Sequence, residues 1–158
     1  MVTQQFEQRT RELIDSLKAI CAAYGLGNDG NEFKIITQVF LYKFLNDKFA
    51  FEAKKIRPDL AKAESWEAAM ATMNADDREM LQMQMGPDTA RLKPEHFIAH
   101  LFGRQNAPEF AKLFDDTLRD IAITNNDIFA VKTDGGAKIT LFDRVSEFIT
   151  DTSKRDAF

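Results

Sequence analysis

The chain has 158 residues, a formal net charge of -4 at pH 7 and a hydrophobic fraction of 44%. These values are typical of one soluble globular domain, and no segment approaches the ~20 consecutive apolar residues that a membrane span needs. The one cysteine excludes an internal disulfide, and the scattered lysines and arginines give no overall attraction to nucleic acid or to an anionic membrane. The N-terminal stretch lacks the layout of a secretory signal, so we expect a cytoplasmic protein.

Residues 4–24 carry apolar side chains at steps of three, four or seven, which predicts a helix that ends at Gly25. The stretch GLGNDG at 25–30 matches the G-x-G-x-x-G spacing of dinucleotide-binding proteins. That motif needs a strand before the turn, because the strand-to-helix turn aims backbone amides at phosphates. A helix C-cap, a turn and an N-cap near Asn31 explain the stretch, so we predict no nucleotide site. Cys21 lies among small residues and is expected to be a buried, inert thiol.

The second helix is predicted over about 31–56, and it is apolar nearly all round. A helix of this kind must be covered on several sides, so we expect it to be the buried centre of the fold. Three cations, Lys54, Lys55 and Arg57, stand near its C-terminal end, where the helix dipole favours positive charge. They are either solvated or in contact with DNA phosphates, since such contacts need only cations and amides without strict spacing.

Shorter helices are predicted beyond Pro58. Ser65 can cap a helix through WEAAMATM, and the acidic residues at 76–77 suit the first turn of a helix through REMLQMQM. Proline is favoured in the first turn of a helix, so Pro94 and Pro108 are each expected to begin one.

Residues 128–141 are the exception to the helical pattern, because two short β-prone runs flank an Asp-Gly-Gly turn and predict a β-hairpin. A last helix is expected from Asp143, and the final SKRDAF looks like the start of another helix cut short. The predicted fold is therefore mainly α: a helical bundle around a central buried helix at about 31–56, with one small β-hairpin. We predict that 1–158 is a single domain and an N-terminal fragment of a longer protein.

Two residue pairs could carry binding chemistry. His96 and His100 are four residues apart on a predicted helix and would share one face, as a metal-binding pair can. No cysteine or histidine cluster completes a ligand shell, so we predict no metal site and keep a small metal-dependent enzyme as an alternative. Lys132 and Lys138 lie on either side of the hairpin turn, where they are either solvated or in contact with DNA phosphates.

Carboxylates and methionines complete the candidates. The side chains of Asp115 and Asp116 point about 100° apart on a helix, which predicts a solvated face and not a catalytic pair. The methionines of residues 66–85 form a group: Met70, Met73, Met80, Met83 and Met85. Methionine fills irregular cores and also forms adaptable partner surfaces. We favour the core, and the alternative is a partner surface made of Met80, Met83 and Met85.

The stretch GNEFKIITQVFLYKFLNDKF resembles the N-terminal helical domain of the modification (M) subunits of type I restriction-modification systems. Those subunits carry a similar long helix, with a Leu-Ser-Asp or Leu-Asn-Asp phrase before Lys and Phe. The phrase in this chain is Leu45, Asn46, Asp47, Lys48 and Phe49. The preceding helix, the later PEFAKLF helix and the LFDRVSEFI close follow in a similar order, so the resemblance spans most of the chain.

The resemblance implies that the intact protein is a site-specific DNA methyltransferase that transfers methyl from S-adenosylmethionine to adenine N6 in duplex DNA. It also implies partners: duplex DNA, a specificity (S) subunit, a restriction (R) subunit and a second M subunit. The enzyme would need an α/β domain with a glycine-rich cofactor loop and an Asn-Pro-Pro-aromatic phrase, which we expect downstream of Phe158. This chain then has no catalytic, cofactor-binding or metal residue of its own, and would assist DNA clamping and subunit assembly.

The alternative hypothesis is a free-standing helical protein-interaction module without catalysis. Its methionine-rich segment or its hairpin would dock a protein partner. The two hypotheses differ in what the gene encodes after residue 158.

Overall fold

The structure is a computed structural model of the chain. It describes residues 2–27, 30–126, 131–132, 138–139, 142, 144–149 and 151–158. The α-helices are α1 (Val2–Ala23), α2 (Gly30–Ile56), α3 (Pro58–Lys62), α4 (Trp66–Thr72), α5 (Ala75–Gln84), α6 (Ile98–Phe102) and α7 (Phe110–Thr124). The 3₁₀ helices are η1 (Pro94–His96), η2 (Val145–Phe148) and η3 (Thr152–Lys154). The prediction of a mainly helical fold is confirmed.

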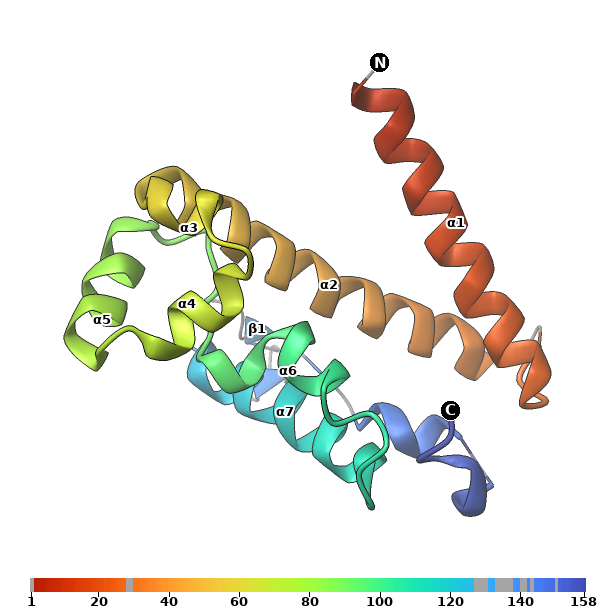
Figure 1. Cartoon of the computed structure of the whole chain (residues 1–158). Coiled ribbons are helices and arrows are strands. Elements are labelled where there is room, and N and C mark those ends of the chain that lie inside the picture. The colour runs from red at the N-terminus through yellow and green to blue at the C-terminus, as the bar shows by residue number, and fades with distance from the viewer. Residues whose placement is uncertain are drawn as a thin grey trace.

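The helices gather along one side of α2. Figure 1 shows α2 crossing the molecule, with α4 to α7 on one side of it, α3 at its C-terminal end and α1 rising from its N-terminal end at a wide angle. The C-terminal segment returns to the same end of α2, beside the start of α7 (Figure 1). The helix α2 is therefore the element on which the others are arranged.

The strands β1 (Val131–Lys132) and β2 (Lys138–Ile139) form an antiparallel pair, with Val131 opposite Ile139. This ladder is only two residues long. The rest of the hairpin predicted over 128–141 lies outside the described residues. A full hairpin is therefore not established as an element of this fold.

The turn after α1 has the geometry that the sequence predicts for a helix C-cap. Gly25 has a φ of 79°, in the left-handed region that glycine adopts without strain. The N–H of Leu26 donates to the carbonyl of Cys21 at 2.8 Å, and the N–H of Gly25 donates to the carbonyl of Ala22 at 3.1 Å. These two bonds make a Schellman motif, so the glycine spacing at 25–30 follows a helix and not a strand.

One face of α2 carries the centre of the core. Its buried apolar residues recur at helical spacing: Ile35, Tyr42, Leu45, Phe49 and Ala53. The ring of Phe49 packs against Trp66 on α4 and Phe97 after η1, with centroid distances of 6.2 and 5.4 Å. Trp66 and Phe97 are 4.6 Å apart, which closes a three-ring cluster. Burial of large aromatic side chains supplies much of the stability of a small domain.

Polar side chains of the same segment attach two further parts of the chain to α2. The Oδ1 atom of Asn46 accepts the N–H of Ile98 at 3.0 Å, which satisfies a free amide at the start of α6. The Nζ atom of Lys48 donates to the carbonyl of Asp88 at 2.8 Å. The phrase Leu45–Phe49, which carries the resemblance described above, is therefore a structural anchor of this fold.

The opposite face of α2 is exposed, so the prediction of a helix covered on several sides was wrong. Phe33, Phe44 and Phe51 have exposed fractions of 74%, 55% and 65%. The sequence pattern fails here because periodicity counts apolar residues but does not show whether this chain or another molecule covers them.

Side-chain caps begin two short helices, and the cap at Ser65 is the one that was predicted. The hydroxyl of Ser65 accepts the N–H of Ala68 at 3.1 Å at the start of α4. The acidic first turn of α5 is preceded by Asn74, whose Oδ1 accepts the N–H of Asp77 at 2.8 Å. Both caps are local interactions between residues three positions apart.

The two helix starts predicted at prolines differ from the observed ones. Pro94 begins the short 3₁₀ helix η1, and the extended backbone of Phe97 separates η1 from α6. Pro108 does not begin α7, because Glu109 has a left-handed φ of 58° and the helix begins at Phe110.

The C-terminal segment is attached to α7 and α2 by side-chain caps. The carboxylate of Asp115 accepts both the N–H and the hydroxyl of Ser146, so its prediction as part of a solvated face was wrong. Asp156 accepts the N–H of Ala111 in the first turn of α7 at 3.0 Å. Asn31 is not an N-cap but donates to the carbonyl of Phe148 at 3.3 Å.

The last helix was predicted from Asp143, which lies outside the described residues. The described residues that follow form only 3₁₀ helices, η2 and η3. Cys21 is fully buried, as predicted, and burial is the main cause that raises the pKa of its thiol. A raised pKa keeps the thiol protonated and unreactive at neutral pH.

We predict that Asn46→Ala lowers the free energy of unfolding by about 1–3 kcal/mol, because it leaves the N–H of Ile98 without an acceptor beside the core. Chemical denaturation measures the change. The matched control is Lys43→Ala on the same helix, which removes the exposed ion pair with Asp47 and should change the free energy by less than about 1 kcal/mol. Equal losses in the two variants would contradict the anchoring role of Asn46.

Candidate interaction surfaces

Arg57, at the end of α2, is paired within the chain. Its Nε and Nη2 atoms donate to the two carboxylate oxygens of Asp59, both at 2.9 Å. The same hydrogen bonds lower the pKa of the Asp59 carboxyl. A bidentate pair occupies the donors that would otherwise hold a phosphate, so Arg57 is a weaker candidate for DNA contact than the sequence predicts.

The two lysines before it are less constrained. The Nζ atom of Lys54 lies 6.0 Å from the centroid of the Trp66 ring. The Nζ atom of Lys55 is 3.9 Å from the carboxylate of Glu52, at the limit of an ion pair, and its side chain is 66% exposed. Exposed pairs of this kind are worth little, so Lys55 can change partners at low cost.

Lys132 and Lys138 are opposite one another in the β1–β2 ladder. The pairing brings these two positions together in the backbone, although five residues lie between them in the sequence. A role for either lysine in binding DNA stays a prediction.

The methionines divide between core and surface. Met70 and Met85 are buried, with exposed fractions of 1% and 8%. Met80 and Met83 on α5 have exposed fractions of 55% and 70%. Core packing, the favoured prediction, is therefore confirmed for Met70 and Met85, and only Met80 and Met83 of the alternative partner surface are exposed.

A cleft of about 770 Å³ lies between α5 and the segment that leads to η1. Its lining holds both cations and carboxylates, among them Arg78, Glu79, Lys93 and Glu95. Arg78 donates to the carbonyl of Met73 at 2.8 Å at the end of α4. Cations that are already engaged beside carboxylates do not make a binding site for phosphate, so we assign this cleft no ligand.

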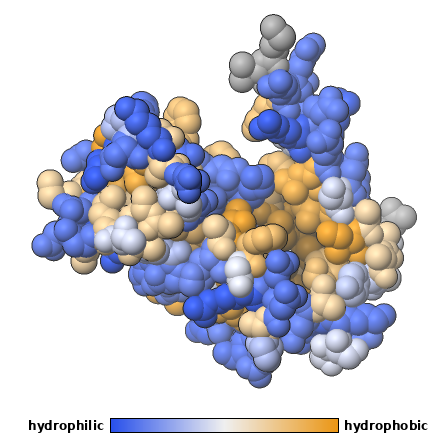
Figure 2. Space-filling model, in the orientation of Figure 1, coloured by the Kyte–Doolittle hydropathy of each residue, from blue (hydrophilic) through white to orange (hydrophobic). Residues whose placement is uncertain are grey.

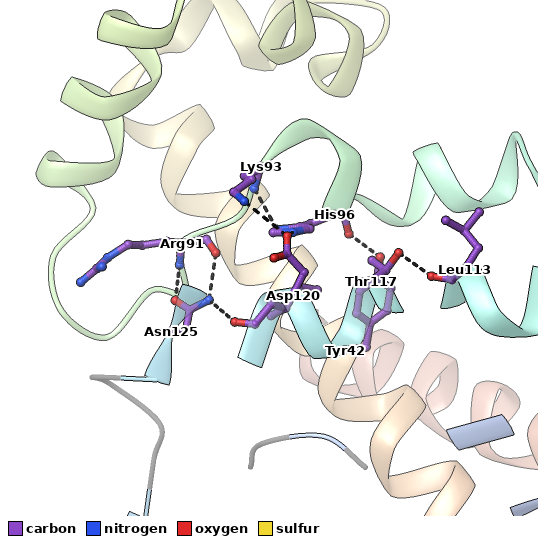
Figure 3. Close-up of polar contacts among 9 residues, drawn as sticks. Tyr42, Arg91, Lys93, His96, Leu113, Thr117, Asp120 and Asn125 are labelled. Atoms are coloured by element: carbon purple, nitrogen blue, oxygen red, sulfur yellow. Dashed lines mark hydrogen bonds and ion pairs between the residues drawn. The ribbon is translucent and has the colours of Figure 1, made fainter. Parts of the chain in front are cut away.

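His96 belongs to a buried polar network (Figure 3). Its Nδ1 atom accepts the backbone N–H of Lys93 at 3.1 Å, so Nδ1 carries no proton. Its Nε2 atom is then the protonated nitrogen and donates to Asp120 on α7 at 2.5 Å. The hydroxyl of Tyr42 donates to the carbonyl of the same histidine. The network joins α2, η1 and α7.

Both ring nitrogens of His96 are engaged, which excludes the metal pair with His100. His96 lies in η1 and His100 in α6, so the two residues are not on one helix. Within the described ranges, no group of three His, Cys, Asp or Glu residues is arranged to hold a metal ion. Burial lowers the pKa of His96, against the opposing effect of its hydrogen bond to Asp120.

Asn125, at the end of α7, makes a second buried connection that the sequence did not indicate. Its Oδ1 atom accepts the N–H of Arg91 at 2.7 Å, and its Nδ2 atom donates to the carbonyl of Arg91 at 2.9 Å. The same Nδ2 donates to the carbonyl of Ile121 at 2.9 Å (Figure 3). The only signal in the sequence is an asparagine at a helix end, which does not identify a partner 34 residues away.

An apolar groove lies between α1, α2, α7 and the C-terminal segment, with a volume of about 220 Å³. Its apolar lining is made by Leu17, Ile20, Val39, Phe110, Phe114, Val145, Ile149 and Phe158, and Arg155 also lines it. Figure 2 shows apolar residues gathered in a hollow where α1 meets α2. Phe158 also packs against Tyr24, with ring centroids 5.2 Å apart. The groove can hold one or two large apolar side chains of a partner.

The chain was compared with known proteins. No family model, curated protein or solved structure matches it. Among the helices of the described ranges, none is long and apolar enough to cross a membrane.

We predict that acid weakens the fold through His96. The folded pKa lies below the ordinary value of 6.5, so the unfolded chain binds more protons at pH values between the two. The stabilisation is complete above about pH 6.5 and is lost as pH falls below it, because protonation of Nδ1 breaks the bond from the Lys93 amide.

Urea denaturation at a series of pH values measures this dependence. In His96→Asn, which keeps an acceptor but cannot titrate, the loss of stability between about pH 6.5 and pH 5 should be much smaller. His100→Asn is the matched control and should keep the wild-type dependence. The same pH dependence in His96→Asn and in the wild type would contradict the assignment.

Proposed function

We propose that this chain is the N-terminal helical domain of the M subunit of a type I restriction-modification system, and that it works as an assembly domain. The intact protein would methylate adenine N6 in duplex DNA with S-adenosylmethionine as the methyl donor. The helical domain would help to clamp the DNA and would contact neighbouring subunits.

The observation that carries the assembly role is the apolar groove between α1, α2, α7 and the C-terminal segment. Four parts of the chain converge on it, and its lining is almost entirely apolar. Grooves of this shape bind amphipathic helices by accepting a few large side chains. The exposed Phe6 on α1, with an exposed fraction of 69%, extends the apolar surface away from the groove.

The position of the phrase Leu45–Phe49 supports the resemblance at the level of fold. Asn46 and Phe49 attach α6 and the aromatic cluster to α2. A protein with the same helical architecture would need residues of this kind at these positions. The resemblance rests on residues that stabilise the fold and not on residues that take part in a reaction. This agrees with a helical domain that supports chemistry located elsewhere.

A free-standing interaction module is the second candidate function. The apolar groove supports it equally well, because docking of a protein partner does not depend on a catalytic domain. The exposed Met80 and Met83 on α5 offer an adaptable surface for such a partner.

The gene sequence beyond codon 158 tests the methyltransferase proposal. We expect the reading frame to continue into a strand, a glycine-rich loop and then an Asn-Pro-Pro-aromatic phrase, since S-adenosylmethionine and a flipped adenine need both. A stop codon within a few residues would overturn the proposal and would leave the free-standing module.

DNA binding by the 158-residue chain gives a second test. We expect weak, sequence-independent binding to duplex DNA, with a dissociation constant of about 10⁻⁴ M or weaker, and no binding of S-adenosylmethionine. Lys54→Ala/Lys55→Ala should weaken DNA binding and reduce its salt dependence by one to two counterions, at about 0.9 per phosphate contact. Fluorescence anisotropy at several salt concentrations measures both effects.

The control for the DNA experiment is Lys112→Ala on α7, where the lysine is paired with Asp116 at 2.8 Å. It should leave the salt dependence unchanged. Tight binding of S-adenosylmethionine to the chain, or an equal effect of the control, would contradict the proposed division of labour.

A further inference from the structure

Four phenylalanines form a stripe along the exposed face of α2. Phe33, Phe40, Phe44 and Phe51 follow one another at steps of seven, four and seven residues. At about 100° per residue these positions lie within about 40° of one another around the helix, opposite the buried face. Three of the four are exposed and Phe40 is half-buried. Phe33, Phe44 and Phe51 are therefore open to solvent in the described part of the chain.

The spacing of the stripe is symmetric about position 42. If a second α2 lies antiparallel across the first with its centre at the same position, Phe33 faces Phe51 of the second copy and Phe40 faces its Phe44. An interface between identical copies related by a two-fold axis must be self-complementary in this way. A partner of a different sequence would place no such requirement on the spacing.

The charges beside the stripe are also complementary in the antiparallel arrangement. Lys34 and Glu52 both lie about 100° from the stripe on the same side of the helix. The two-fold axis brings Lys34 of one copy within about two residues, or about 3 Å along the axis, of Glu52 in the other. On the opposite side, Glu32 lies about 100° and Lys54 about 60° from the stripe, and the two-fold axis brings them within about two residues of each other along the helix axis. Opposite charges thus meet at each edge, as at the flanking positions of a coiled coil.

The area of the stripe fits a weak dimer. A phenylalanine exposes roughly 200 Å² when free, so the three exposed rings offer on the order of 400 Å² per copy. Two copies together would bury about 800 Å² of aromatic surface, and the stems of the flanking lysines bring the total toward ~1,200 Å². That is the lower end of specific interfaces, for which dissociation constants in the micromolar range are common.

We propose that two copies of this chain associate through the phenylalanine stripe of α2, as an antiparallel pair centred on position 42. The inference rests on the proposed assembly role, and it identifies one of the partners as a second copy of this chain. It uses a different surface from the apolar groove, which stays open for another partner. It also does not require methyltransferase chemistry.

Sedimentation velocity of the 158-residue chain from about 1 μM to about 500 μM tests the association. The fraction of dimer should rise with concentration in the wild type. Phe44→Asp, which places a charge at the centre of the stripe, should remain monomeric over this range. The matched control is Phe102→Asp on α6, a residue with a similar exposed fraction of 68%, and it should dimerise like the wild type.

Charge reversal tests the antiparallel register. Lys34→Glu and Glu52→Lys should each raise the dissociation constant roughly threefold to tenfold, because like charges then meet at two symmetry-related places. The double variant should restore it to within about twofold of the wild type. Circular dichroism of each variant establishes that α2 is still folded.

A wild-type chain that stays monomeric, or equal effects of the two aspartate variants, would overturn the dimer. A double variant weaker than either single one would overturn the antiparallel register. This outcome is separate from that of the gene test. If the chain stays monomeric and the gene continues into a methyltransferase domain, only the dimer proposal is overturned. If the chain dimerises and the gene stops soon after codon 158, only the methyltransferase proposal is overturned.

Discussion

The packing of Phe49 against Trp66 and Phe97 is the interaction on which the rest of the fold depends. It fixes α4 and the segment after η1 to the same turn of α2. Once Phe97 is in place, the next residue presents its amide to Asn46, and α6 starts from there. Short helices such as these are marginal by themselves, so they owe their existence to this docking and not to their own propensity.

Two polar residues of the α7 segment then attach α7 to residues 91–96. Asp120 on α7 holds His96, and Asn125 one turn further holds the backbone of Arg91. Among the described residues, no buried side-chain nitrogen or oxygen lacks a hydrogen-bond partner. His96, which the sequence analysis considered as a metal ligand, instead joins three elements. Both of its ring nitrogens make hydrogen bonds, so neither is free to bind a metal ion.

The sequence predicted what is decided locally. The end of α1 at Gly25, the cap at Ser65 and the acidic first turn of α5 depend on residues within one turn, and they are found as expected. The partners of Asp115 and Asn125 lie 31 and 34 residues away, and nothing in their own surroundings identifies them. The exposed side of α2 was missed for a different reason, since hydrophobic periodicity predicts a need for cover but not which molecule provides it.

The position of Trp66 has a practical consequence for anyone who studies this protein in solution. It is the chain's single tryptophan, it is 9% exposed, and its indole contacts Phe49 and Phe97 with Lys54 above the ring. Its fluorescence emission therefore reports on the packing of α4 and η1 against α2, and it is insensitive to the N-terminal end of α1. An unfolding curve followed by tryptophan fluorescence records one half of the molecule, so a far-ultraviolet signal dominated by the long helices need not coincide with it.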